Sequence, residues 1–487
     1  MAAAEPPGPP AGPGVRAAPP PPLQPLLQRA ETLRQELAQG KEKPFAEVVW
    51  CHSGDPAAAG RQPLTLLRQV AAACAYPELL ATAAVPAEAK QRARRVLQHL
   101  HGGSPGAYNL EYVTGAVART AARFLERRDA GVPRQPQSIV PCGGTAAAVV
   151  DVLSLVVDAG EAGQVAVLHP VPGPPLHAQA AGLAGAAAVP YLLAEERGWD
   201  VDVGEVRRAL SAARARGRPK VLCVVNPGDP TGHVLSRSSM EAIIRLVDEE
   251  NLLLLADEVH QDSVATPGRP FLSFKRVLHE MGDPLATTVQ LVAFYSLSKG
   301  IAGEAGFRAG FFELVNIDPG ILKCFYTWGR SVYPPILGQV LLDTFMEPPE
   351  PTGPCYPAFA AEEQALRRDL ARKARLLQDV LARAPGIRCQ PVQGGVRAFP
   401  RIQLPPHAVR EAQAQGLEPD FFFCQKLLDA TGIVLAPGSV FGQREGTYHF
   451  GYPRQGAEEP PAARRGGCEG TGVGGWKVWR VSSGLRG

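Results

Sequence analysis

The sequence contains one compact group of side chains suited to covalent chemistry, centred on Lys299. Ser296 and Ser298 precede this lysine, and Arg308 follows it. The group comes directly after an apolar run at 291–294 that predicts a buried strand. Removing an ammonium from water is costly, so a buried lysine has a lowered pKa and can attack a carbonyl. The hydroxyls and the guanidinium could hold a phosphate. This combination predicts pyridoxal phosphate held by Lys299 as a Schiff base, and the alternative is a surface lysine beside a helix-capping serine.

A carboxylate and a glycine-rich turn could complete such a site. Asp257 ends the apolar run 252–256, where it is either a turn or helix-capping acid or the partner that keeps a pyridinium nitrogen protonated. Gly144 and Thr145 stand between a short apolar run and a predicted buried helix at 146–157. This arrangement aims free backbone N–H groups at a phosphate, although glycines in such turns often serve packing only.

The segments that carry these residues predict an α/β fold. Apolar runs typical of strands lie at 165–168, 221–225, 252–256, 291–294 and 311–315, with helical segments between most of them. Such a pattern predicts a mostly parallel sheet covered by helices, with ligands at the carboxyl ends of its strands. Lys299, Asp257 and Asp229 all follow such ends. Ser238 and Glu241 predict a capping box at the start of one helix.

Changes in composition divide the chain into five predicted segments. The first two are a disordered Pro/Ala/Gly-rich lead (1–24) and an N-terminal helical arm (25–105). They are followed by a large cofactor-binding α/β domain (106–347), a small α+β domain that is incomplete at its end (348–450) and a Gly/Arg-rich disordered tail (451–487). Arg16 is the single basic residue of the lead, which therefore makes a poor transit peptide.

Composition narrows the possible partners. The chain has 487 residues, enough for two domains, and its formal net charge of +3 gives no strong attraction to nucleic acid or membranes. No apolar run approaches the roughly 18 residues that span a bilayer. The nine cysteines are scattered, without a CxxC pair or a histidine cluster at metal spacing, so we expect reduced thiols and no metal site. We expect a cytoplasmic protein, with a mitochondrial location left open.

The sequence resembles the alanine aminotransferases, a family of fold-type I pyridoxal-phosphate enzymes, from about Leu26 to Phe450. Two motifs carry the resemblance, Ser-x-Ser-Lys-Gly-x-x-Gly-Glu-x-Gly-x-Arg-x-Gly from Ser296 and the segment Pro-Gly-Ser-x-Phe-Gly-Gln-Arg-Glu-Gly-Thr-Tyr-His-Phe at 437–450. The resemblance implies a seven-stranded, mostly parallel sheet, a homodimer, and ping-pong transfer of an amino group from L-alanine to 2-oxoglutarate, which yields pyruvate and L-glutamate. It implies that Lys299 forms the Schiff base and moves the substrate's proton.

The resemblance also assigns cofactor contacts. It implies that Tyr108 reaches the cofactor of the neighbouring subunit and that the cofactor ring is contacted by Asp257, Asp229 and His260. The residues implied to hold the phosphate are Gly144, Thr145, Ser296, Ser298 and Arg308.

Four positions depart from the family pattern. Asp229 stands where the family has an asparagine that donates to the cofactor's phenolate oxygen, and His260 replaces a tyrosine but can still donate. Pro174 replaces the ring-stacking aromatic residue. Gly451 replaces the arginine that binds the substrate's α-carboxylate, and Arg454 lies an odd three residues further along, on the other side of an extended strand.

These departures predict weakened transamination. The alternative is a catalytically inactive relative that keeps the fold, with or without the cofactor. A dinucleotide-dependent dehydrogenase is disfavoured, because the first strand–turn–helix lacks GxGxxG.

Overall fold

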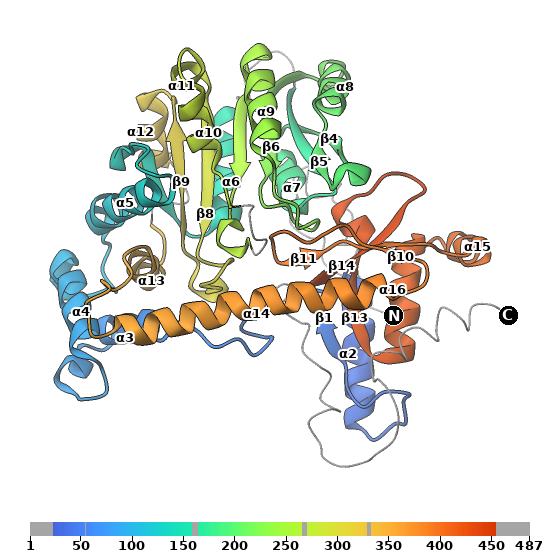
Figure 1. Cartoon of the computed structure of the whole chain (residues 1–487), viewed down its shortest axis with the longest axis horizontal. Helices are drawn as coiled ribbons and strands as arrows, with labels where there is room; N and C mark the ends of the chain where they lie inside the picture. The colour runs from blue at the N-terminus through green and yellow to red at the C-terminus, as the bar shows by residue number, and fades with distance from the viewer. Residues whose placement is uncertain (1–22, 54, 158–163, 265–269, 329–332, 454–487) are drawn as a thin grey trace, which may run out of the picture.

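The computed structural model describes residues 23–53, 55–157, 164–264, 270–328 and 333–453. They form a large sheet flanked by helices and a smaller sheet beside it, with the long helix α14 (Tyr356–Ala382) running between the two (Figure 1). The predictions of disorder for residues 1–22 and 454–487 fall outside the described residues, as does Arg454. The first described helix, α2 (Gln24–Ala38), begins at the end of the predicted lead.

The large sheet has the strand order β2-β9-β8-β7-β6-β3-β4-β5. Its strands are β2 (Ile139–Cys142), β9 (Gly310–Val315), β8 (Leu291–Ser296), β7 (Leu253–Asp257), β6 (Arg218–Val225), β3 (Val165–Val171), β4 (Ala187–Ala194) and β5 (Asp200–Val201). The pairs from β8 to β4 are parallel, whereas β9 and β5 run antiparallel to their neighbours. The predicted mostly parallel α/β sheet is confirmed. It has eight strands rather than seven, because the two-residue β5 extends its edge.

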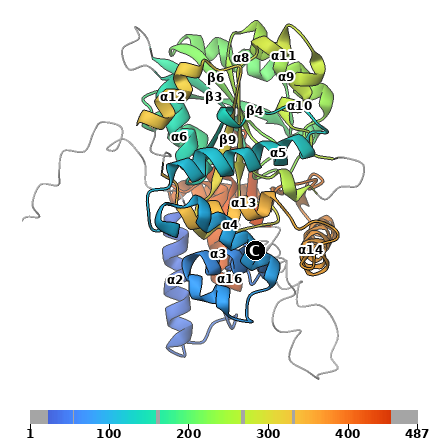
Figure 2. The ribbon, with the colours of Figure 1, turned by 90° about the vertical axis from the view of Figure 1, so that its left-hand side faces the viewer.

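Alternate side chains of the central strands enter two separate cores. Leu254 and Ala256 of β7 pack in one core with the first group of helices, and Leu253 and Leu255 pack in another with the second group. The first group is α8 (Val203–Arg214), α9 (Arg237–Glu249) and α10 (Phe274–Met281), and the second is α6 (Thr145–Val156), α7 (Pro175–Leu183) and α12 (Pro319–Trp328). Figure 2 shows α9 and α10 on one side of the sheet and α6 and α12 on the other. Burial of both faces explains why these strands are apolar throughout.

Helix α9 corrects one detail of the sequence analysis. The capping box predicted at Ser238 and Glu241 is wrong, because the helix begins two residues earlier, at Arg237. Ser236 is the N-cap, and its Oγ accepts a hydrogen bond from the backbone N–H of Ser239 at 3.1 Å. Glu241 instead accepts from Arg237 Nε at 2.8 Å. Two nearby serines offered equivalent caps, and only backbone geometry distinguishes them.

A further core lies against one end of the large sheet. It is built from helices α3 (Thr65–Ala75), α4 (Ala87–His99), α5 (Ala118–Arg128) and α13 (Ile336–Met346), together with a π-helix at Tyr112–Val117. The short helix α11 (Leu285–Thr288) is not part of this core and packs with α9 and α10. Tyr295, Leu297 and Phe311 belong to the same core. The segment that leads to Lys299 is therefore packed on a helical base.

The smaller sheet has the order β1-β13-β14-β12-β10, with β11 also paired to β14. Its elements are β1 (Val49–Cys51), β10 (Ile387–Arg388), β11 (Arg397–Ala398), β12 (Arg401–Ile402), β13 (Ile433–Pro437), β14 (Tyr448–Pro453), α15 (Pro406–Ala414) and α16 (Pro419–Thr431). Strand β1 comes from the N-terminal arm and pairs with β13, so the arm supplies one strand of the small sheet. Helices α3 and α4 of the same arm pack against the large sheet. The predicted boundary at Phe450 falls inside β14, which continues because Tyr452 and Pro453 pair with β11.

Helix α14 joins two of the cores. Phe359 and Leu370 pack in the helical base of the large sheet, whereas Leu377 and Leu381 pack beneath the small sheet. Figure 1 shows the helix crossing the molecule between these regions. The sequence predicted this helix at 360–384. Within the described residues, no helix is both long and apolar enough to cross a membrane.

Candidate active site

Lys299 lies just beyond the carboxyl end of β8, beside the end of β7. Asp257 ends β7 and pairs in register with Phe294 of β8. Burial is the main cause of a lowered pKa for the Lys299 ammonium, while the carboxylates of Asp229 and Asp257 act in the opposite direction. The structure therefore places Lys299 and both acids that the sequence analysis singled out at or after the carboxyl ends of the neighbouring strands β8, β7 and β6, at the sheet edge where an α/β fold binds its ligand.

Two arginines of the N-terminal arm fix the turn that follows Lys299. Arg61 Nη1 donates to the carbonyl oxygen of Gly300 at 2.9 Å. Arg68, on α3, makes two hydrogen bonds of 2.8 Å with the buried carboxylate of Glu304. The backbone N–H of Glu304 in turn donates to Leu297. Neither arginine was predicted, because both act across more than two hundred residues of chain.

Gly144, Thr145, Ser298 and Arg308 meet at the amino end of α6. Arg308 Nη1 donates to Ser298 Oγ at 3.3 Å. A Cβ atom built on Gly144 would lie 2.2 Å from Arg308 Nη2, and the φ angle of Gly144 is +103°. The positive φ favours glycine at this position, and an added Cβ would force the Arg308 guanidinium to move. Ser296 is one step removed, since its Oγ accepts the backbone N–H of Ser298 at 3.2 Å.

This cluster fits a phosphate. Thr145 Oγ1 is buried and, within the described part of the chain, has no hydrogen-bond partner. Thr145 is also the first residue of α6, where backbone N–H groups lack intrahelical acceptors. With the Arg308 guanidinium and the Ser298 hydroxyl, these donors match the needs of a phosphate dianion.

A histidine missed by the sequence analysis supports Asp257. His177 on α7 is buried, and its Nε2 lies 3.3 Å from Asp257 Oδ2, an electrostatic contact whose angle is not that of a hydrogen bond. The backbone N–H of Val259 lies 3.4 Å from Oδ1 of the same carboxylate. Asp257 is therefore held by neighbours on its own loop and on a separate helix. A lone histidine on a short helix offers no signal of this role.

Asp229 meets an arginine that was also missed. Arg397 Nη1 donates to both carboxylate oxygens of Asp229, at 2.8 and 3.0 Å. His260 Nε2 lies 3.7 Å from Asp229 Oδ2. Burial alone would raise the pKa of Asp229, but Arg397 and His260 hold this pKa well below its usual range. Asp229 is consequently ionised at neutral pH and can only accept hydrogen bonds.

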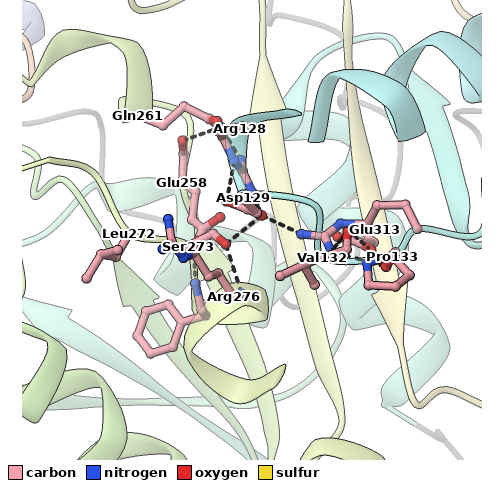
Figure 3. Close-up of polar contacts among 12 residues, drawn as sticks. Arg128, Asp129, Val132, Pro133, Glu258, Gln261, Leu272, Ser273, Arg276 and Glu313 are labelled. Atoms are coloured by element: carbon pink, nitrogen blue, oxygen red, sulfur yellow. Dashed lines mark hydrogen bonds and ion pairs between the residues drawn. The ribbon is translucent and has the colours of Figure 1, made fainter. Parts of the chain in front are cut away.

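A buried polar cluster supports the turn that carries His260 (Figure 3). Arg128 bonds to Asp129 and, through Nη1, to Gln261 Oε1 at 2.5 Å. Glu258 accepts the backbone N–H of Phe274 at 2.7 Å. The cluster thus fixes both residues that flank the Val259–His260 pair, and it holds the turn against the end of α5.

Tyr108, Pro174 and Gly451 lie on other elements than Lys299. Tyr108 is 83% exposed and packs edge-on against Tyr333 with ring centroids 5.4 Å apart. Pro174 forms the N-cap of α7. Gly451 lies in β14, where a Cβ atom would meet the Phe441 ring at 2.9 Å.

Comparison with known proteins identifies relatives along most of the chain. Residues 75–450 match the model of the family described as aminotransferase class I and II. Alanine aminotransferase 1 of Homo sapiens is 48% identical over 427 residues, which cover 88% of this chain and 86% of that protein. Glutamate–glyoxylate aminotransferase 1 of Arabidopsis thaliana is 37% identical over 431 residues, covering 87% of each.

Solved structures share the fold at low sequence identity. An alanine aminotransferase from Pyrococcus furiosus superposes with a TM-score of 0.72 at 16% identity, covering 98% of this chain and 99% of that one. A mutant aspartate aminotransferase from Thermus thermophilus gives a TM-score of 0.66 at 17% identity, covering 98% of each chain. These likenesses concern the arrangement of the two sheets and their helices.

Proposed function

Because this chain belongs to the class I and II aminotransferases, which are pyridoxal-phosphate enzymes, we propose that it transfers the amino group of L-alanine to 2-oxoglutarate, with Lys299 as the catalytic residue. The observation that carries the proposal is the position of Lys299, which follows the strand paired with the one that Asp257 ends and adjoins Ser298 of the cluster of phosphate-binding donors. Amino acids and 2-oxo acids are the substrates of this family, and the human relative named for alanine motivates the specific pair.

Each side chain has a proposed task. When bound, pyridoxal phosphate supplies a ring that withdraws electrons from the substrate's α-carbon. Lys299 would hold the cofactor through its amine and would act as the base and acid that move the proton of the substrate's α-carbon. Its lowered pKa favours the neutral amine that this proton transfer requires. Asp257 stabilises the protonated ring nitrogen.

The phosphate would be held at the amino end of α6. The side chains proposed for this task are Thr145, Ser296, Ser298 and Arg308, and Gly144 allows Arg308 to approach.

We propose that this activity is weaker than in relatives with the full motif. Asp229 cannot donate a hydrogen bond to the phenolate oxygen, although its charge is balanced by Arg397. His260 remains a possible donor. Gly451 contributes no charge to the substrate's carboxylate. Loss of one buried charge-assisted contact costs about 2–5 kcal/mol, which corresponds to a factor of roughly 30 to 3,000 in rate.

The second candidate is a non-catalytic relative that keeps the fold. Asp229 and Gly451 are the observations that favour it, because both remove a contact to cofactor or substrate. The two candidates differ in one result: only the enzyme converts the bound cofactor to its amine form when alanine is added.

Visible absorption of the cofactor-loaded protein tests the proposal. We expect a band from the lysine-bound cofactor that borohydride abolishes, that Lys299→Ala removes, and that alanine shifts toward the amine form. Lys426→Ala is the matched control, since Lys426 is a half-exposed lysine on α16. A band that persists in Lys299→Ala would contradict the role of Lys299. A normal band that alanine leaves unchanged would favour the non-catalytic candidate.

We further propose a homodimer in which Tyr108 reaches the partner's cofactor. Tyr108 and Tyr333 are both exposed, at 83% and 60%, and lie edge to face. Exposed aromatic pairs of this kind are typical of interfaces. Analytical ultracentrifugation would show a dimer that Tyr108→Ala weakens, and a monomer at all concentrations would contradict the proposal.

A further inference from the structure

Arg397 brings a positive charge into the candidate site to which no role has yet been assigned. Its side chain is 12% exposed, and it belongs to the small sheet rather than to the large sheet that carries Lys299. Its charge acts on two neighbours. Burial and then Arg397 lower the pKa of His52, and Arg397 adds to the effect of burial in lowering the pKa of Lys299. Arg397 is thus within electrostatic range of the Lys299 amine.

The guanidinium of Arg397 is only partly used by its carboxylate partner. Both hydrogen bonds to Asp229 come from a single nitrogen, Nη1. Nε is buried and has no hydrogen-bond partner among the residues that the structure describes. A guanidinium binds a carboxylate best through two parallel N–H groups. A buried N–H without an acceptor costs stability, so an arriving carboxylate that accepts from Nε would remove that cost.

Arg397 also lies next to the position where the family arginine is missing. Strand β11 pairs with β14, and Arg397 is in register with Pro453, two residues beyond Gly451. The Phe441 ring connects the two places. Its Cε2 would be 2.9 Å from a Cβ on Gly451, and its centroid lies 5.4 Å from the guanidinium carbon of Arg397. The Phe441 ring therefore lies against both Arg397 and the position of Gly451.

We propose that Arg397 binds the α-carboxylate of the amino acid and oxo acid substrates, in place of the arginine that the family carries after Phe450. The inference rests on the proposed transamination, because it assigns a specificity-determining residue to that site. Asp229 is part of the same device. Its carboxylate occupies Nη1 and offsets the charge of Arg397, so it competes with the substrate for the same guanidinium.

Binding of glutarate, an unreactive dicarboxylate, to the cofactor-loaded protein tests this assignment by calorimetry. Arg397→Gln alone would leave Asp229 buried without its partner and could impair folding. The decisive comparison is therefore between D229N and D229N/R397Q, neither of which has an unpaired carboxylate. Arg401→Gln is the matched control, because Arg401 lies on β12 of the same sheet and bonds to Glu195 at 3.4 Å.

The expected results have defined signs. D229N should bind glutarate more tightly than the unmodified chain, because Arg397 loses its competing acid. D229N/R397Q should bind about 30-fold more weakly than D229N, which corresponds to about 2 kcal/mol. R401Q should bind within about twofold of the unmodified chain, as expected for a separate site. Equal affinities for D229N and D229N/R397Q would overturn the assignment of Arg397.

The result of the glutarate comparison is independent of the result that decides the proposed transamination. Glutarate binding is measured without any reaction, whereas transamination is judged from the absorption band that alanine shifts. A normal response to alanine, combined with equal glutarate affinities, would refute Arg397 alone. Absence of the band would refute the role of Lys299, and the glutarate comparison, made then on the same variants without cofactor, would decide whether Arg397 binds carboxylates.

Discussion

Placing a side chain at Gly451 should destabilise the protein, which is unusual for a glycine in a strand. A Cβ atom there would lie 2.9 Å from Cε2 and 3.3 Å from Cζ of Phe441. The ring cannot easily yield, because it packs edge-on against Phe399 at 5.9 Å and lies against Arg397. Overpacking of this kind costs about 1–3 kcal/mol. Replacing glycine by alanine in a regular strand normally gains about 0.5–1 kcal/mol. We therefore expect Gly451→Ala to lower the free energy of unfolding by roughly 1 kcal/mol.

Denaturant unfolding monitored by fluorescence is the assay, with Gly182→Ala as the control. Gly182 lies in α7 with no atom within 4 Å of a built Cβ, so alanine there should stabilise by about 0.5–1 kcal/mol. The cost at Gly451 should disappear in a Phe441→Leu background, where the ring is gone. A Gly451→Ala protein as stable as Gly182→Ala would refute the reasoning. The same contact predicts that Gly451→Arg, which restores the family's residue, is also destabilised.

Three further predictions address the cofactor site and its supports. Gly144→Ala should weaken cofactor binding more than about tenfold in an absorbance titration, because Cβ would displace Arg308 and the backbone would be strained; unchanged affinity would contradict the phosphate cluster. Burial raises the pKa of Glu258 to about 8, so the native state keeps a proton that the unfolded chain releases near pH 4.5, and this stabilisation is lost as the pH rises toward 8. The free energy of unfolding of Glu258→Gln should therefore rise relative to that of the unmodified chain by up to about 1.4 kcal/mol per pH unit across that window. A difference between the two proteins that does not change with pH would contradict the raised pKa of Glu258. Arg68→Met should cost about 1–3 kcal/mol by leaving the buried Glu304 unpaired, and Arg68→Met/Glu304→Gln should recover part of it in the same assay.

The parts of the fold and site that could be predicted are those with a local signal. Each of the five predicted apolar runs lies at least largely within a strand, since burial on both faces demands uninterrupted apolar residues. Lys299, Asp257 and Asp229 were found because polar side chains at the ends of such runs are conspicuous. The two-residue β5 was missed because it is too short for any periodicity.

The rest of the site depends on contacts between distant segments. Arg397 meets Asp229 across 168 residues, from a strand of two residues that carries no pattern. His177 meets Asp257 only because α7 packs on the sheet beside β7. Asp229 was expected to lack the hydrogen bond that the family's asparagine donates, and its pairing with Arg397 could not be foreseen without the fold. A single sequence gives no means of locating such pairs.

Helix α14 has a consequence for how the two halves of this site are spaced. Lys299 stands on the large sheet and Arg397 on the small one, while Phe359 and Leu381 anchor the helix in the cores beneath them. An unbroken helix keeps a constant rise per residue, so its length serves as a spacer between those anchors. Inserting four residues between them would lengthen the helix by about 6 Å and rotate its far end by about 40°, while leaving the helical hydrogen-bond pattern intact. The spacing between the segments that carry Lys299 and Arg397 thus depends on a residue count far from either of them.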